Sequence, residues 1–184
     1  MIQHAILHDT RLGGRASGSR QGYRLYRTNG NISLNWTLNH VKNDAVENGG
    51  IDTLHIYCHG YAGENEAARV CGDFGGQGLE LGREAVTLHN VEVMKLLKGC
   101  ANKIIIHACA AADSTWAHLD MYSDGQLLMR RIALNSGAYV TAADRIQWYQ
   151  ENSQIPDGRI DFGSWEGNVF MFPPTGGSPI LVAS

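Results

Sequence analysis

The chain has 184 residues, of which 43% are hydrophobic and 18% are charged, and its formal net charge is −3 at pH 7. This length predicts a single domain, residues 1–184, large enough to bury a core. A mildly acidic chain without a run of ~20 apolar residues gives no reason to expect a nucleic acid, an anionic membrane surface or a membrane span.

The N-terminal stretch, MIQHAILHDTRLGG, lacks the basic start, apolar core and small-residue cleavage site of a secretory signal peptide. The four cysteines show no dense disulfide spacing, so we expect reduced thiols. Together these features predict a cytoplasmic protein, or an effector exported without a signal peptide. The sequence leaves the oligomeric state open.

The first half of the chain predicts a strand at 1–7 and a Gly/Ser/Arg-rich loop after it. Asn29-Gly30 lies between β-type residues and predicts a hairpin in YRLYRTNGNISL. Apolar residues at three- and four-residue steps predict an amphipathic helix at 34–46, which Gly49-Gly50 closes. The strand TLHIYC follows at 53–58, and then a loop at 60–78, whose glycine-rich end, Gly72 to Gly78, is predicted to be a flap over the site.

The second half predicts further alternation of strands and helices. The expected elements are a short strand in GLELG, a helix at 90–98 with Asn90 as N-cap, a strand at 103–108, a helix at 124–136, a strand at 138–143 and a last strand before Pro173-Pro174. Continuous apolar strands alternating with helices predict an α/β fold: a mostly parallel sheet with helices on both faces, in three layers. Ligand sites in such sheets lie beyond the carboxyl ends of the strands.

Two strands end in chemically active residues. TLHIYCHG ends in His59-Gly60, and KIIIHACA ends in Ala108-Cys109, one helix later. If the two strands are neighbours, ~5 Å apart, the imidazole and the thiol come within reach of one another. An imidazole accepts the proton of a thiol nucleophile, and the Gly60 and Cys109 N–H groups would form an oxyanion hole. The small residues Ala108, Ala110, Ala111 and Ala112 would leave room for a peptide.

This pair of motifs resembles the signature of the caspase-like (clan CD) cysteine peptidases, which include caspases, legumain, gingipains, clostripain, separase and bacterial toxin self-processing domains. The resemblance covers about half the chain, 51–143, and the His–Cys separation matches the value of about 50 residues found in caspases. It implies that His59 is the catalytic histidine, Gly60 an oxyanion donor and Cys109 the nucleophile. It also implies a protein or peptide substrate, no cofactor, and a histidine that backbone alone orients.

The sequence around the cysteine departs from the caspases. HACAA replaces their Gln-Ala-Cys-x-Gly, so the bacterial members are the closer match, including the later segment GAYVTAAD. In relatives the strand in that segment helps wall the specificity pocket, which implies a place there for Ala142, Ala143 and Asp144. Caspases also use an arginine of the first loop to hold an acidic side chain, a part that Arg11 or Arg15, or neither, would play.

Other readings of the same residues stay open. His107 lies on the strand face of Cys109 and either lines the site or is a buried structural histidine, whereas Cys58 should point into the core. Zinc is the chemical rival, although no Cys-x-x-Cys or paired-histidine motif supports it and no metal is predicted. The alternative function is a catalytically inactive caspase-like module that binds or scaffolds other proteins.

Overall fold

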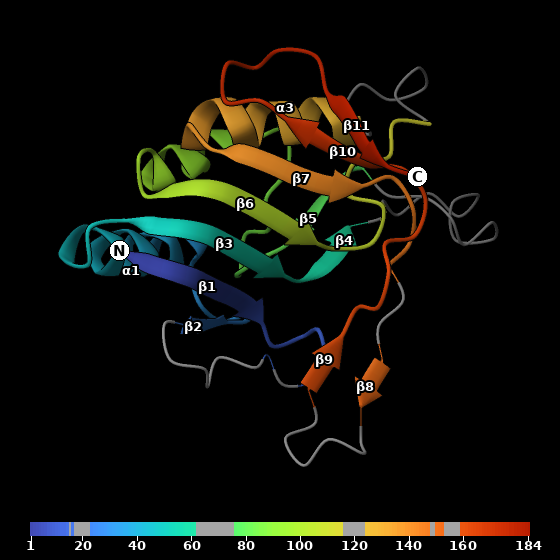
Figure 1. The fold of residues 1–184 in the computed structure, drawn as a ribbon. Coiled ribbons are helices and arrows are strands. Elements are labelled where there is room, and N and C mark those ends of the chain that lie inside the picture. The colour runs from blue at the N-terminus through green and yellow to red at the C-terminus, as the bar shows by residue number, and fades with distance from the viewer. Residues whose placement is uncertain (15, 17–22, 62–75, 116–123, 148–149, 153–158) are drawn as a thin grey trace.

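The computed structural model describes residues 1–14, 16, 23–61, 76–115, 124–147, 150–152 and 159–184. Seven strands form its main sheet, in the order β11-β10-β7-β6-β3-β1-β2 (Figure 1). These are β1 (Ile2–Asp9), β2 (Tyr23–Thr28), β3 (Ile51–Tyr57), β6 (Ala101–His107), β7 (Tyr139–Ala143), β10 (Val169–Phe172) and β11 (Ile180–Ala183). Five neighbours from β2 to β7 run parallel, while β10 and β11 pair antiparallel. The prediction of an α/β fold with a mostly parallel sheet is confirmed.

The predicted hairpin around Asn29-Gly30 is wrong. β2 pairs in parallel with β1, with Ala5 opposite Arg24, so the chain crosses over before β2 instead of turning back after it. Asn29 opens a turn in which its side-chain oxygen accepts the Asn31 N–H at 2.8 Å. Because Ser33 then caps a helix, the β-type residues after the turn continue as helix and not as a returning strand.

Two of the three expected helices form as α-helices. α1 (Leu34–Glu47) begins at Ser33, whose hydroxyl accepts the Trp36 N–H, and α3 (Gly125–Ser136) begins at Asp124, whose carboxylate accepts the Leu127 N–H. The third element, η1 (Val91–Leu97), is a 3-10 helix. Asn90 does not cap it, because the Asn90 side chain accepts the Thr87 N–H and thereby ties down the preceding turn.

The described helices share one face of the sheet. η1 contacts both α1 and α3, and in Figure 1 the helices lie behind the strands. Their apolar sides pack on alternate residues of the central strands, all fully buried: Leu54, Ile56, Ile104, Ile106 and Val140. The expected three-layer arrangement is therefore not confirmed, since each described helix covers this helical face. None of them has the length and apolar character to cross a membrane.

The opposite face of the sheet, here called the histidine face, carries a row of aromatic rings. His4 of β1, His55 of β3 and His107 of β6 are joined by two hydrogen bonds of 3.3 Å between ring nitrogens. Tyr23 stacks on His4 at one end of the row. The histidines lie diagonally on neighbouring strands, a spacing that rings bridge readily. Burial and the neighbouring histidines lower the pKa of His55 to about 4 and that of His107 to about 3.

Two small sheets lie at the carboxyl end of the main sheet. β4 (His59–Tyr61) pairs antiparallel with β5 (Gly78–Glu80), which confirms a short strand in GLELG. β8 (Gln150–Asn152) and β9 (Arg159–Asp161) form a second pair within the segment that connects β7 to β10. The predicted flap falls mostly on 62–75, outside the described residues.

Candidate active site

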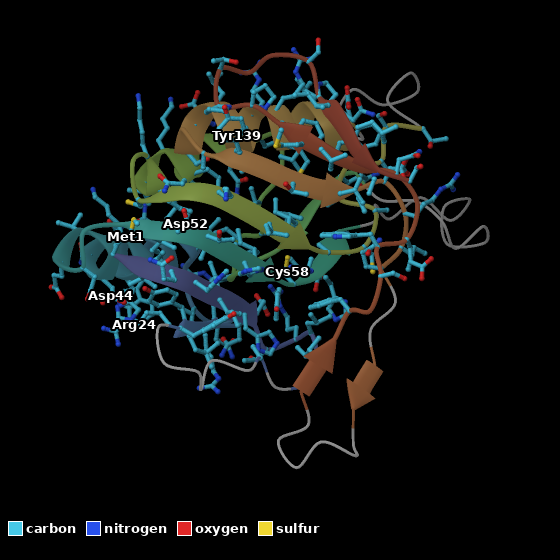
Figure 2. The ribbon with its side chains drawn as sticks, viewed as in Figure 1. Met1, Arg24, Asp44, Asp52, Cys58 and Tyr139 are labelled. Carbon is cyan, nitrogen blue, oxygen red and sulfur yellow. The ribbon has the colours of Figure 1, made fainter. Side chains whose placement is uncertain are left out.

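The two motif-bearing strands are direct neighbours. β3 and β6 pair in parallel, with Tyr57 opposite His107, and the Cys58 N–H donates to the carbonyl oxygen of His107 at 3.4 Å. The segments that follow β3 and β6 therefore leave the main sheet at the same edge, the carboxyl end of its parallel strands. Cys58 marks this edge at the end of β3 in Figure 2.

Gly60 brings the two motifs into contact. A Cβ atom built on Gly60 would overlap the carbonyl oxygen of Cys109 and lie 2.9 Å from its carbonyl carbon and 3.1 Å from its nitrogen. The backbone of the His-Gly motif thus packs directly on the backbone of the Ala-Cys motif, an approach that only glycine permits. The sequence placed the ends of the two strands at one edge of the sheet. The contact made by Gly60, a residue of β4, now brings the two motifs together there.

His59 is oriented by a backbone carbonyl. Its ring is partly exposed, and Nε2 lies 3.2 Å from the carbonyl oxygen of Arg11. Because a carbonyl oxygen only accepts, Nε2 carries the proton, and in the neutral ring Nδ1 is left as a proton acceptor. No carboxylate partner was expected for this histidine, and the structure supplies the Arg11 carbonyl instead.

Arg11 is held by a buried carboxylate that sequence reasoning missed. Asp9 ends β1 with its side chain 0% exposed, and its oxygens accept from Arg11 Nε at 2.9 Å and Arg11 Nη2 at 2.7 Å. Asp9 also accepts the Gly82 N–H at 2.9 Å. Burial by itself raises the pKa of Asp9, but the hydrogen bonds from Arg11 and Gly82 outweigh burial and lower it. A carboxylate closing the apolar run IQHAILHD was the signal available in the sequence.

This ion pair bears on the expected specificity arginines. The Arg11 guanidinium donates hydrogen bonds to Asp9 and to the carbonyl oxygen of Gly82. These bonds hold the loop in which the backbone carbonyl of Arg11 orients His59. The Arg11 side chain is still 34% exposed, and its predicted role in holding an acidic side chain stays a prediction. Arg15 lies outside the described residues.

The turn that carries Cys109 is strained and tied to the next strand. Ala110 adopts φ = 47°, a left-handed conformation that costs a non-glycine residue about 1 kcal/mol or more. Its N–H donates to the carbonyl oxygen of Arg145 at 2.8 Å, and the Ala112 N–H donates to that of Ala143 at 2.9 Å. The Cys109 thiol is partly exposed, and Sγ donates to the carbonyl oxygen of Gln147 at 3.7 Å.

The alanines around Cys109 lie in a closely packed turn. Ala108, Ala110, Ala111 and Ala112 are all buried. Two further glycines press on this turn: a Cβ on Gly76 would overlap the Asp113 carbonyl oxygen, and one on Gly125 would crowd the carbonyls of Ala111 and Asp113. Three segments thus pack backbone against backbone around this turn, and the room for a peptide beside the alanines stays a prediction.

The predicted pocket residues end β7 beside this turn. Ala142 belongs to the core under the helices, whereas Ala143 alternates onto the histidine face and is also buried. Asp144 accepts the Asn168 N–H and an Asn168 side-chain N–H, both at 2.9 Å. Ala142 thus packs in the core, and the Asp144 carboxylate closes the start of the β7–β10 connection. Their predicted role in a specificity pocket stays a prediction.

The remaining candidates separate by strand face. Cys58 is 1% exposed, and burial raises the pKa of its thiol, as expected for a core cysteine. His107 stacks on Phe162 and Trp165, with ring centroids 4.6 and 5.2 Å apart. Its ring nitrogen bonds to His55, which fits the structural reading of His107.

Across the parts of the chain that the structure describes, no three His, Cys, Asp or Glu side chains are grouped in a way that could hold a metal ion. No protein-family model, no curated protein and no solved structure matches the chain. The residues at this edge of the sheet are therefore the features from which a function can be inferred.

Proposed function

We propose that the chain is a cysteine endopeptidase of the caspase-like group that acts on protein or peptide substrates. The contact between Gly60 and the Cys109 backbone carries the proposal, because it joins the two halves of the Cys-His pair at one edge of a parallel sheet. The Arg11 carbonyl adds support, since it holds Nε2 of His59 and leaves Nδ1 as the base.

In the proposed reaction Cys109 is the nucleophile. Its proton passes to Nδ1 of His59, and the thiolate sulfur bonds to the carbonyl carbon of the scissile peptide. The N–H groups of Gly60 and Cys109 stabilise the oxyanion. When the C–N bond breaks, the leaving amine takes the proton from His59, and water then hydrolyses the thioester to return the free thiol and release the acid product. No metal or organic cofactor takes part in these steps.

A non-catalytic binding module is the second candidate, and one observation favours it. The Cys109 thiol donates to the carbonyl oxygen of Gln147, so a group other than His59 engages it in the structure. A scaffold protein would keep this contact permanently, whereas a peptidase must free the thiol for attack.

A peptide-library cleavage screen tests the proposal. We expect the wild-type protein to cleave a subset of peptides, and Cys109→Ala or His59→Ala to lower the rate by about 10³-fold or more. Cys100→Ala, at a buried cysteine beside β6, is the matched control and should retain cleavage. Cleavage that survives in Cys109→Ala would reject the nucleophile. Absence of cleavage, together with a Cys109 alkylation rate that His59→Ala leaves unchanged, would support the scaffold.

A further inference from the structure

The connection between β7 and β10 is far longer than their pairing requires. The two strands are antiparallel neighbours, with Ala143 opposite Val169, and such strands are usually joined by two to five residues. Asp144 and Asn168 continue the pairing, because the Asp144 N–H donates to the Asn168 carbonyl oxygen at 3.0 Å. The chain between them makes an excursion beyond the sheet, and long excursions of this kind usually carry function.

A buried glutamine clips the two ends of this excursion together. Gln147 is 4% exposed, and its side-chain amide bonds to both backbone groups of Glu166: Nε2 donates to the carbonyl oxygen at 3.0 Å, and Oε1 accepts the N–H at 3.3 Å. The same residue presents its own carbonyl oxygen to Cys109 Sγ. The clip therefore fixes the group that contacts the thiol.

Two aromatic side chains anchor the far end of the excursion on the histidine face. Phe162 stacks on His107 and meets Tyr57 edge-on, with centroids 4.8 Å apart, and Trp165 stacks on His107 with its ring 13° from parallel. Aromatic contacts of this kind contribute about 0.5–1.5 kcal/mol each beyond area burial. Their strength is enough to hold a segment down and small enough for binding to release it.

We propose that residues 144–147 and 160–168 form a latch that occupies the position of a substrate in the resting protein and must open before a peptide reaches Cys109. This inference rests on the proposed function for the identity of the incoming peptide. A peptide carbonyl has the same chemistry as the Gln147 carbonyl, so an extended peptide competes for the same place beside the thiol. Phe162 and Trp165 determine how firmly the latch stays closed, because their rings are the part of the latch that stacks on a side chain of the histidine face, that of His107.

The test compares the access of two thiol reagents to Cys109, followed at each cysteine by mass spectrometry. Iodoacetamide is small, whereas a biotin-linked maleimide is bulky and needs the latch open. Phe162→Ala combined with Trp165→Ala should speed maleimide labelling of Cys109 by about tenfold, and iodoacetamide labelling by much less. Trp36→Ala removes a ring that stacks on His40 of α1 and should change neither rate. Cys58 should stay unlabelled throughout, which shows that the variants remain folded.

The outcomes separate the latch from the peptidase proposal. Unchanged or slower maleimide labelling of the folded double variant overturns the latch and makes the excursion a fixed wall of the site, whatever the cleavage screen gives. Faster labelling without any cleavage supports the latch and counts against the peptidase. If the double variant labels Cys58, Trp165→Leu alone replaces it, and the same increase in the maleimide rate relative to the iodoacetamide rate decides the question.

Discussion

Cys58 and Cys109 follow neighbouring strands at the same edge of the sheet, yet they lie in opposite environments. Cys58 continues the side-chain alternation of Leu54 and Ile56 and is buried under the helices. Cys109 continues the alternation of His107 and stays partly exposed beside the β7–β10 connection. A shift of one residue along a strand moves a side chain to the other face, so parity alone makes one thiol core and the other a candidate nucleophile.

The difference between the two thiols also explains the two faces of the sheet. The helical face is closed by apolar packing, and the described part of the histidine face is closed by rings, hydrogen bonds and the latch. Apolar packing leaves no polar group available for a reaction. The imidazole and tyrosine rings of the histidine face do carry polar groups, and they lie beside the segment that we propose can move. Four measurements bear on this contrast, taken from the largest expected effect to the smallest.

Gly60→Ala tests the contact that joins the two motifs. The added Cβ would overlap the Cys109 carbonyl oxygen, and both partners are backbone, so neither can move aside cheaply. We expect the free energy of unfolding to fall by about 3 kcal/mol, measured by urea denaturation. At Gly177 the nearest atoms to an added Cβ are 3.4 Å away, so Gly177→Ala is the control and should cost about 0.5 kcal/mol or less. Equal midpoints for the two variants would contradict the close approach.

Acid should lower the free energy of unfolding because of the buried histidines on the histidine face. The pKa values of His55 and His107 lie at about 4 and about 3 in the folded protein, below the ordinary value of 6.5. Between pH 6.5 and pH 4 the unfolded chain therefore takes up protons that the folded chain refuses, and stability falls as the pH falls. We expect a loss of about 2 kcal/mol between pH 7 and pH 4.5 in urea denaturation.

Removal of one ring identifies the source of that pH dependence. His55→Gln should make the free energy of unfolding depend less steeply on pH between pH 6.5 and pH 4.5, because the variant lacks one of the two histidines whose pKa is lowered in the folded protein. Val46→Gln replaces an exposed side chain of α1 that carries no titratable proton, so it should leave the slope as in the wild type. A slope that responds equally to both variants would show that burial on the histidine face is not its cause.

The two cysteines give the smallest expected effect on stability. Cys58→Ala leaves a gap in a closely packed core and should lower the free energy of unfolding by about 1 kcal/mol. Cys109→Ala, at the partly exposed site, should change it by less than about 0.5 kcal/mol. Thermal unfolding of the two variants measures the difference, and a larger loss from Cys109→Ala would reverse the assignment of core and site.

Much of the fold could be predicted because its signals are local. The apolar spacing and the closing Gly49-Gly50 predict α1, and the apolar runs before His59 and Cys109 predict β3 and β6. Their adjacency was a condition of the predicted site, and the parallel pairing of β3 with β6 meets it. The positions of His59, Gly60 and Cys109 at one edge needed nothing beyond this order and the alternation of side chains.

The rest depended on contacts between residues far apart in the sequence. The parallel pairing of β2, the 3-10 geometry of η1 and the single helical face follow from packing partners that no local pattern specifies. The same holds for Asp9 against Gly82, which are 73 residues apart, and for Gln147 against Cys109, which are 38 residues apart.

By itself the sequence determined the candidate residues and the strand ends that present them, because periodicity and strand order are written along the chain. Only the tertiary structure decided what those residues touch. It gave His59 a backbone carbonyl, engaged the expected specificity arginine Arg11 with a buried carboxylate, and set a glutamine carbonyl beside the thiol. The physical reason is that hydrogen bonds and close backbone approach depend on distances of a few tenths of an ångström, which the folded chain sets and the order of residues does not.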